Sequence, residues 1–186
     1  MKNIVKGTIL AALGLALAAT PALAQKPKVE FSAQFIGLNL SNPDGSGNNS
    51  TNFLLGSGSF SSGFYVNEMI AIEPTLLYGY TKDEGASDAN TALGLDIAVP
   101  IYLSRGYGRS GGLFIAPYVG YTRFSSGGSS ASQNHFGANL GTKIKVMDCL
   151  YWRGQVGAEM GLENKTDGLP KYTDINASFG ISVYLH

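Results

Sequence analysis

The chain has 186 residues, with 13 Lys and Arg, 13 Asp and Glu, 25 glycines, 10 tyrosines and one cysteine. This length suits a single domain, but charged residues make up only 14% of it, against about 25% in an ordinary soluble domain. The balanced charge argues against nucleic acid as a partner. A single cysteine excludes an intramolecular disulfide and a zinc site built from several thiols.

The N-terminal segment has the pattern of a secretory signal peptide. Lys2 and Lys6 precede an apolar run over 9–19, which is too short for the about 20 residues of a transmembrane helix. Cleavage is expected between Ala24 and Gln25, where Ala22 and Ala24 supply the small residues of the cleavage site. We therefore expect residues 1–24 to be a signal peptide and residues 25–186 to form one barrel domain.

The remaining chain alternates between apolar and polar residues, as β-strands do. Clear alternation covers 70–81, 91–103, 136–146, 150–163 and 174–186. Weaker alternation covers 29–40, 52–66 and 113–124. Gly and Ser blur the weaker segments, and Pro117 argues against an ordinary central strand. No stretch after residue 24 reaches 18 apolar residues, so membrane entry would require a closed barrel of these eight strands.

The connections between these segments alternate in length. Long, polar connections are expected over 41–51, 82–90, 125–134 and 164–171. Short turns are expected near 67–68 and 148–149, with one longer connection at 104–111. An even strand number with long and short connections at opposite ends predicts an all-β, eight-stranded antiparallel up-and-down transmembrane barrel. Both ends of the barrel domain would then lie on the periplasmic side.

Alternation by itself also fits a soluble, lipocalin-like barrel that binds an apolar ligand inside. Two observations favour the membrane barrel, with its polar face inside. The polar face is rich in glycine, which suits a narrow lumen, and aromatic residues gather near strand ends, as at membrane interfaces. The aromatic residues near strand ends are Tyr78, Tyr80, Tyr102, Tyr121, Tyr151 and Trp152, although Tyr102 and Tyr151 fall on the polar face.

Three segments carry a resemblance to a known family. They are Gly-Phe-Tyr-Val-Asn-Glu-Met-Ile at 63–70, Phe-Ile-Ala-Pro-Tyr-Val-Gly-Tyr at 114–121, and the alternating strand at 179–185. With them, 29–186 resembles the small Gram-negative outer-membrane β-barrels typified by outer-membrane protein X and the transmembrane domain of outer-membrane protein A. The resemblance implies an outer-membrane location, contact with lipid and lipopolysaccharide, and insertion by the barrel assembly machinery. The last strand of that family usually ends in an aromatic residue, whereas this chain ends Tyr184-Leu185-His186.

Charged residues on the polar face would point into the lumen of such a barrel. Because buried charges are costly unless they are paired, we expect a salt-bridged plug in preference to a path for ions or protons. The residues expected to form this lumen charge network are Glu73, Asp96, Lys143, Arg153 and Glu159. We expect Glu73, Lys143, Arg153 and Glu159 to lie at its centre.

His135 is the residue that could support an enzymatic alternative. It follows Ser129, Ser130 and Ser132, and Glu163 or Asp174 would lie on neighbouring strands, so a Ser/His/acid set acting on lipid A is conceivable. However, the lipid A deacylase barrels have a Ser two positions after the His, and Phe-Gly follows His135 here. We therefore expect a barrel without enzymatic activity or a cofactor, with a structural role or a role in surface interaction through its long loops.

Overall fold

The structure is a computed structural model of the chain. The residues that it describes are 29–43, 50–81, 90–103 and 111–185. The predicted signal peptide with its cleavage site, and most of the expected loops at 41–51 and 82–90, lie outside these residues. Within the described part of the chain, no helix is long and apolar enough to cross a membrane.

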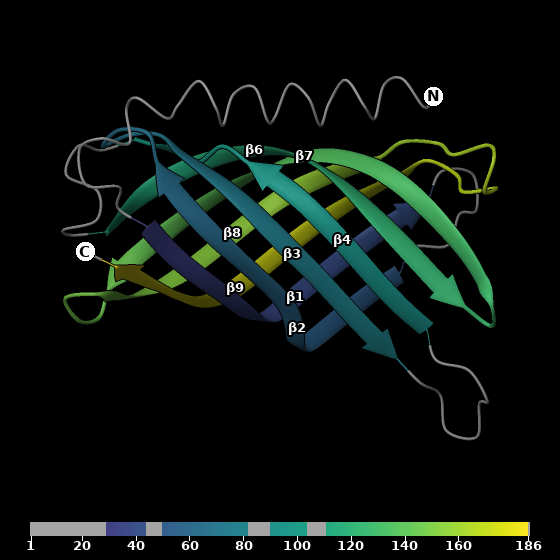
Figure 1. The fold of residues 1–186 in the computed structure, drawn as a ribbon, viewed down its shortest axis with the longest axis horizontal. Helices are drawn as coiled ribbons and strands as arrows, with labels where there is room; N and C mark the ends of the chain where they lie inside the picture. The colour runs from purple at the N-terminus through teal and green to yellow at the C-terminus, as the bar shows by residue number, and fades with distance from the viewer. Residues whose placement is uncertain (1–28, 44–49, 82–89, 104–110, 186) are drawn as a thin grey trace.

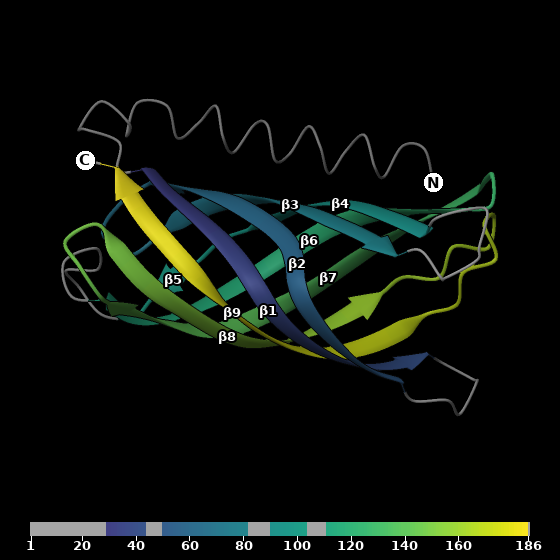
Figure 2. The ribbon, with the colours of Figure 1, turned by 90° about the horizontal axis from the view of Figure 1, so that it is seen from below.

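The described residues form one antiparallel sheet that closes on itself (Figures 1 and 2). Its strands are β1 (Val29–Pro43), β2 (Ser50–Tyr65), β3 (Ala71–Thr81), β4 (Asn90–Ala98), β5 (Ile101–Tyr102), β6 (Gly111–Ser126), β7 (Ser129–Lys145), β8 (Leu150–Gly161) and β9 (Tyr172–Leu185). Consecutive strands pair from β1 to β4 and from β5 to β9, while β4 also pairs with β6 and β1 with β9. The pairing of β1 with β9 closes the barrel.

β4 and β5 are two parts of one barrel strand, so the nine strands make eight crossings. The break falls at Val99-Pro100, opposite Pro117 of β6. Val99 donates its backbone N–H to the Pro117 carbonyl at 2.9 Å, but Pro117 has no N–H to return, and Pro100 has none either. Two prolines at neighbouring positions of the ladder therefore interrupt it. The prediction of eight antiparallel strands is confirmed.

The two ends of the barrel differ in their connections (Figures 1 and 2). We call one end the turn end: it carries the turns at 66–70 and 146–149, and Val29 pairs there with Leu185. We call the other end the loop end, which carries the β1–β2, β3–β4, β6–β7 and β8–β9 connections. The N-terminus of β1 and the C-terminus of β9 thus lie side by side at the turn end.

The connection between β6 and β7 differs from the expected loop over 125–134. The two strands continue to Ser126 and Ser129, which pair with each other, and only Gly127 and Gly128 form the turn. Their φ angles are 55° and 80°, which is the left-handed region that a two-residue hairpin turn requires and that glycine readily adopts. The expected long loop was wrong, because serine-rich composition suggested a loop where this Gly-Gly pair closes a hairpin.

A bulge in β1 explains the blurred alternation of 29–40. The register of β1 shifts between Gln34 and Ile36 against both of its neighbours. Against β9, Phe35 is the extra residue, whereas against β2 the extra residues belong to β2, where 56–58 lie between the partners of Gln34 and Ile36. Glu30 and Ser32 are buried before the bulge, whereas Gly37 is the buried residue after it. The inward-facing positions therefore change from even to odd numbers at Phe35.

The faces of the sheet decide between a membrane barrel and a soluble one. Large apolar side chains are exposed along the outer face of nearly every strand, including Leu76, Leu95, Leu140 and Val156, each at least half exposed. Charged and hydroxyl side chains are buried inside. The soluble barrel with an apolar interior is thus contradicted, because this exterior suits lipid and not water.

Several inward-facing glycines make room for aromatic rings from the neighbouring strand. Gly141 pairs with Phe114, and a Cβ at Gly141 would collide with the Phe114 ring. Tyr118 lies over Gly137 in the same way. The glycine-rich polar face thus lets large rings lie flat across the wall of a narrow lumen.

Candidate functional site

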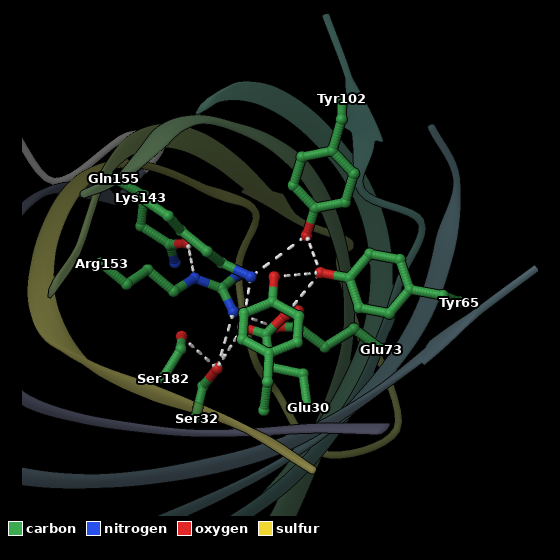
Figure 3. A network of polar contacts seen from close by, with 10 residues as sticks. Glu30, Ser32, Tyr65, Glu73, Tyr102, Lys143, Arg153, Gln155 and Ser182 are labelled. Carbon is green, nitrogen blue, oxygen red and sulfur yellow. Dashed lines mark hydrogen bonds and ion pairs between the residues drawn. The ribbon is translucent and has the colours of Figure 1, made fainter. Parts of the chain in front are cut away.

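The polar side chains inside the barrel form two groups, one toward each end. Near the turn end lies a group that we call the turn-end network (Figure 3). Its members are Glu30, Ser32, Tyr65, Glu73, Tyr102, Lys143, Arg153, Gln155, Ser182 and Tyr184. They come from β1, β2, β3, β5, β7, β8 and β9, so side chains from nearly the whole circumference meet in the lumen.

Two ion pairs across the lumen form the centre of the turn-end network. The Arg153 guanidinium donates to a Glu73 carboxylate oxygen at 2.7 Å, and each side chain is 3% exposed. The Lys143 ammonium donates to Glu30, and this pair is also buried. Two cations thus face two carboxylates, and each buried charge has the partner that makes burial tolerable.

Tyrosines complete the hydrogen bonding of these charges. The Tyr65 hydroxyl donates to the second Glu30 oxygen at 2.6 Å and lies 2.6 Å from the Tyr184 hydroxyl. Lys143 donates to the Tyr102 hydroxyl at 3.1 Å, and its ammonium lies 5.4 Å from the centre of that ring. The rings therefore fill the lumen between the charges and stabilise the cation through their π faces.

Toward the loop end lies a second group, which we call the loop-end cluster. Its members are Asn39, Asp96, Tyr118, His135, Asn139, Glu159, Tyr172 and Asp174. His135 Nε2 lies 2.8 Å from Asp96 and 3.9 Å from Glu159. Tyr118 and Tyr172 each donate a hydroxyl to Glu159, at 2.8 and 2.5 Å.

The loop-end cluster is not balanced in charge. It contains the carboxylates of Asp96, Glu159 and Asp174, and among the described residues no Lys or Arg forms an ion pair with them. His135 is the side chain that can carry a positive charge beside two of these carboxylates, those of Asp96 and Glu159. Negative charge therefore exceeds positive charge here, in contrast to the turn-end network.

The five residues expected to form one charge network are divided between these two groups. Glu73, Lys143 and Arg153 lie in the turn-end network, whereas Asp96 and Glu159 lie in the loop-end cluster. Glu159, expected at the centre with the other three, bonds to Tyr118 and Tyr172 instead. The division follows from the stagger between neighbouring strands, which sets the height of each residue along the barrel.

Glu30 was missed as a member of the network, although it accepts a hydrogen bond from Lys143. Its segment has weak alternation because of the bulge at Phe35, so its inward position could not be assigned. Tyr102 was considered for the interfacial aromatic belt, but it is fully buried in the lumen. Its place on the polar face was the signal for this position.

The serine residues expected near His135 make other contacts. The Ser132 hydroxyl donates to Asp167 at 3.1 Å, and the Ser130 hydroxyl accepts from Arg123 at 3.1 Å. The acid beside His135 is Asp96, and not Glu163 or Asp174 as considered from the sequence. His135 is itself 4% exposed and points into the lumen, away from the lipid side.

A closed antiparallel barrel with an apolar exterior and a polar lumen is the architecture of an outer-membrane β-barrel protein. The model of the family described as outer membrane protein beta-barrel domain matches residues 10–182, and the chain belongs to this family. It is thus an outer-membrane protein of the Gram-negative, porin-like type. Comparison with curated proteins gives no match.

Solved structures of outer-membrane proteins have the same fold. Neisserial surface protein A (NspA) is similar with a TM-score of 0.59 and 13% identity, covering 84% of this chain and 96% of that one. OprG from Pseudomonas aeruginosa gives 0.54 and 12%, covering 86% and 96%. Ail, the attachment invasion locus protein of Yersinia pestis, gives 0.50 and 10%, covering 87% and 100%. Identities this low indicate a shared fold.

Proposed function

We propose that this protein is a non-enzymatic outer-membrane barrel whose lumen is closed by the turn-end network and whose loop end interacts at the cell surface. The observation that carries the proposal is the pair of buried ion pairs, Arg153 with Glu73 and Lys143 with Glu30. An eight-stranded barrel has an interior just wide enough for side chains. With these side chains and the rings of Tyr65 and Tyr102 inside it, the turn end has no room for a column of water.

Passage of an ion would require at least one of these pairs to separate. Breaking a buried pair leaves an uncompensated charge, at a cost of about 3–5 kcal/mol. The Arg153 and Glu73 side chains are each 3% exposed, so water does not replace the lost partner. The proposal is therefore a closed lumen and not a pore.

The surface role rests on what the loop end offers. By the general layout of these barrels, short turns face the periplasm and the opposite end faces outward. The β6–β7 hairpin carries exposed polar residues to its tip at Gly127 and Gly128. The β8–β9 connection is tied to it by Asp167, which accepts from the Ser132 N–H at 2.8 Å. We include the other loops, 41–51 and 82–90, in this surface by their place in the chain.

Membrane lipid, lipopolysaccharide and the barrel assembly machinery are the general partners in this proposal. The apolar outer face supports contact with lipid.

The alternative of a lipid-A-modifying enzyme would depend on His135. Its imidazole is buried in the lumen and bonds to Asp96, away from the apolar outer face of the barrel that supports contact with lipid. No serine hydroxyl bonds to His135 among the described residues. This geometry supports a structural role for His135.

Conductance in a planar bilayer tests the closed lumen. We expect no single-channel steps from the wild-type protein and steps from Arg153→Ala with Glu73→Ala, which removes one pair entirely. Steps from the wild type at the same frequency would overturn the proposal.

For the enzymatic alternative, lipid A is compared by mass spectrometry between cells with the wild-type protein and cells with His135→Ala. We expect identical spectra, and a mass difference between them would establish an enzyme.

A further inference from the structure

We propose that a groove on the outer wall of the barrel binds one acyl chain of a membrane lipid and retains it more firmly than the surrounding lipid is held. The groove, which we call the outer groove, crosses β6, β7, β8, β9 and β1. Figure 2 shows β8, β9 and β1 side by side on this wall. The inference concerns the outside of the barrel and is independent of the closed lumen.

Small residues form the floor of the outer groove. Gly154 of β8 pairs with Thr142 of β7, and both line the groove together with Ala177 of β9. Gly154 faces outward, since the neighbouring Arg153 is buried in the lumen. A Cβ at Gly154 would meet Phe179 at 3.8 Å, which is an ordinary van der Waals contact. The wall at this point is therefore only as thick as the backbone.

Larger side chains rise on both sides of this floor. Toward the loop end, Leu140 pairs with Val156, and the two are 51% and 54% exposed. Toward the turn end, the Phe179 ring stacks on the Trp152 ring, with the ring centroids 5.1 Å apart. Phe35, at the bulge of β1, packs edge-on against Phe179 at 6.0 Å. The outer groove thus has an aliphatic wall on one side and an aromatic wall on the other.

The length of the outer groove suits a single acyl chain. It extends from Leu113 on β6 to Leu38 on β1. Neighbouring strands are about 4.8 Å apart, so the four spacings between these strands add up to about 19 Å. The hydrocarbon core of a bilayer is about 30 Å thick, so a chain of one leaflet spans about 15 Å. One chain can therefore lie along the groove.

The position and the chemistry of the outer groove select lipid as its occupant. The groove is continuous with the apolar outer face, which contacts the membrane in a barrel of this family. None of the described residues that line it carries a charge, so it fits the apolar part of a lipid and not the head group. Within a membrane, apolar groups associate through close packing, because lipid removes the hydrophobic driving force. A chain in the groove contacts the floor and both walls, and this added contact retains it.

Retention of a brominated phospholipid tests the proposal. Trp152 is the only tryptophan of the chain, and it is 41% exposed beside the groove, where bromine on a bound acyl chain would quench its fluorescence. The protein is folded in vesicles of phosphatidylcholine with brominated acyl chains. It is then extracted into cholate, which has no alkyl chain to compete for the groove, and freed of unbound lipid by gel filtration. We expect one retained phospholipid per barrel by mass spectrometry, and weaker Trp152 fluorescence than in protein prepared with unbrominated lipid.

Filling the floor of the groove should release this lipid. Gly154→Leu places a side chain where the acyl chain would lie, and we expect retained lipid to fall about fivefold or more, because overfilling a packed space is costly. Ala158→Leu is the matched control: it adds similar bulk on the same strand and the same exposed face, outside the groove, and should retain lipid as the wild type does. If Gly154→Leu fails to fold, as judged by heat-modifiable gel mobility, Ala177→Leu fills the floor from β9.

Three outcomes would overturn the proposal. The first is a wild type that retains no phospholipid, and the second is equal retention in the wild type and the folded groove variants. The third is a wild-type dimer in cholate, seen by analytical ultracentrifugation, that Gly154→Leu dissociates, because this would assign the groove to a second copy of the chain. Conductance distinguishes this test from that of the closed lumen: single-channel steps from a wild type that retains lipid would contradict the closed lumen alone.

Discussion

Arg153 on β8 and Glu73 on β3 are joined by a 2.7 Å hydrogen bond across the lumen, although their strands are not neighbours in the sheet. The bond links opposite parts of the barrel wall. Because both groups are buried, removing one partner leaves the other charge buried without compensation, which costs more than breaking a surface ion pair.

Reversing the charge of Arg153 should therefore destabilise the barrel. Arg153→Glu places a third carboxylate beside Glu73 and Glu30, and we expect the free energy of unfolding to fall by about 3–5 kcal/mol. Urea unfolding in lipid vesicles, followed by tryptophan fluorescence, measures this change. Lys165→Glu, on a side chain 82% exposed, is the control and should stay near the wild type. Unchanged stability in Arg153→Glu would contradict the pairing.

A side chain at Gly141 should disturb the packing of the lumen. Gly141→Val would displace the Phe114 ring, which lies over this glycine, and we expect a loss of about 1–3 kcal/mol from overpacking. The matched control is Gly154→Val, since Gly154 meets only Phe179, at 3.8 Å. The heat-modifiable fraction on a gel and the urea midpoint both report the difference. Equal behaviour of the two variants would be inconsistent with the lumen packing.

A charged substitution on the outer face should destabilise the barrel more strongly the closer it lies to the middle of the bilayer. Leu140, near the middle of β7, is 51% exposed, and we expect Leu140→Arg to cost about 2–4 kcal/mol. Met147 lies in the turn after β7 and is 65% exposed, so Met147→Arg should cost about 0–1 kcal/mol, as expected near an interface. Unfolding free energies in vesicles measure both. A larger cost at Met147 would mean that the lipid belt lies elsewhere.

The orientation of the barrel can be tested with its own cysteine. Cys149 is exposed in a turn at the turn end, whereas Gly128 is at the tip of the β6–β7 hairpin at the loop end. We expect a large polyethylene-glycol maleimide to label Gly128→Cys with Cys149→Ser in intact cells, and native Cys149 only after the outer membrane is permeabilised. The reverse pattern would place the loop end in the periplasm.

Much of the fold could be predicted from the sequence, because the side-chain period of two identifies strands and their faces. The alternation of inward and outward positions along each strand was sufficient to place Glu73, Lys143 and Arg153 inside the barrel. Alternation could not give the position of a residue along the barrel axis, because that position depends on the stagger between strands. It therefore could not separate Glu159 from these three residues. The regular alternation is interrupted where the strand pairing is irregular, at Phe35, and for this reason the inward position of Glu30 was not predicted.

The β6–β7 hairpin illustrates the same limit. Serine, glycine and asparagine over 125–134 have the composition of a loop, but composition does not report backbone pairing. The Gly127-Gly128 dipeptide was the local signal for a tight turn. The hydrogen bond between His135 of β7 and Asp96 of β4 joins strands that are not neighbours in the sheet, so no local pattern could have identified it.

The bulge in β1 lies in the strand pair that closes the barrel, and Gly180 of β9 lies directly against it. A Cβ at Gly180 would collide with the Ala33 carbonyl and the Gln34 backbone. If β9 slipped by two residues during closure, Ser178 or Ser182 would face Gln34, and neither has room for its side chain. A slip by one residue would turn the apolar face of β9 inward. The first and last strands can thus join in only one alignment, and the bulge is the feature that selects it.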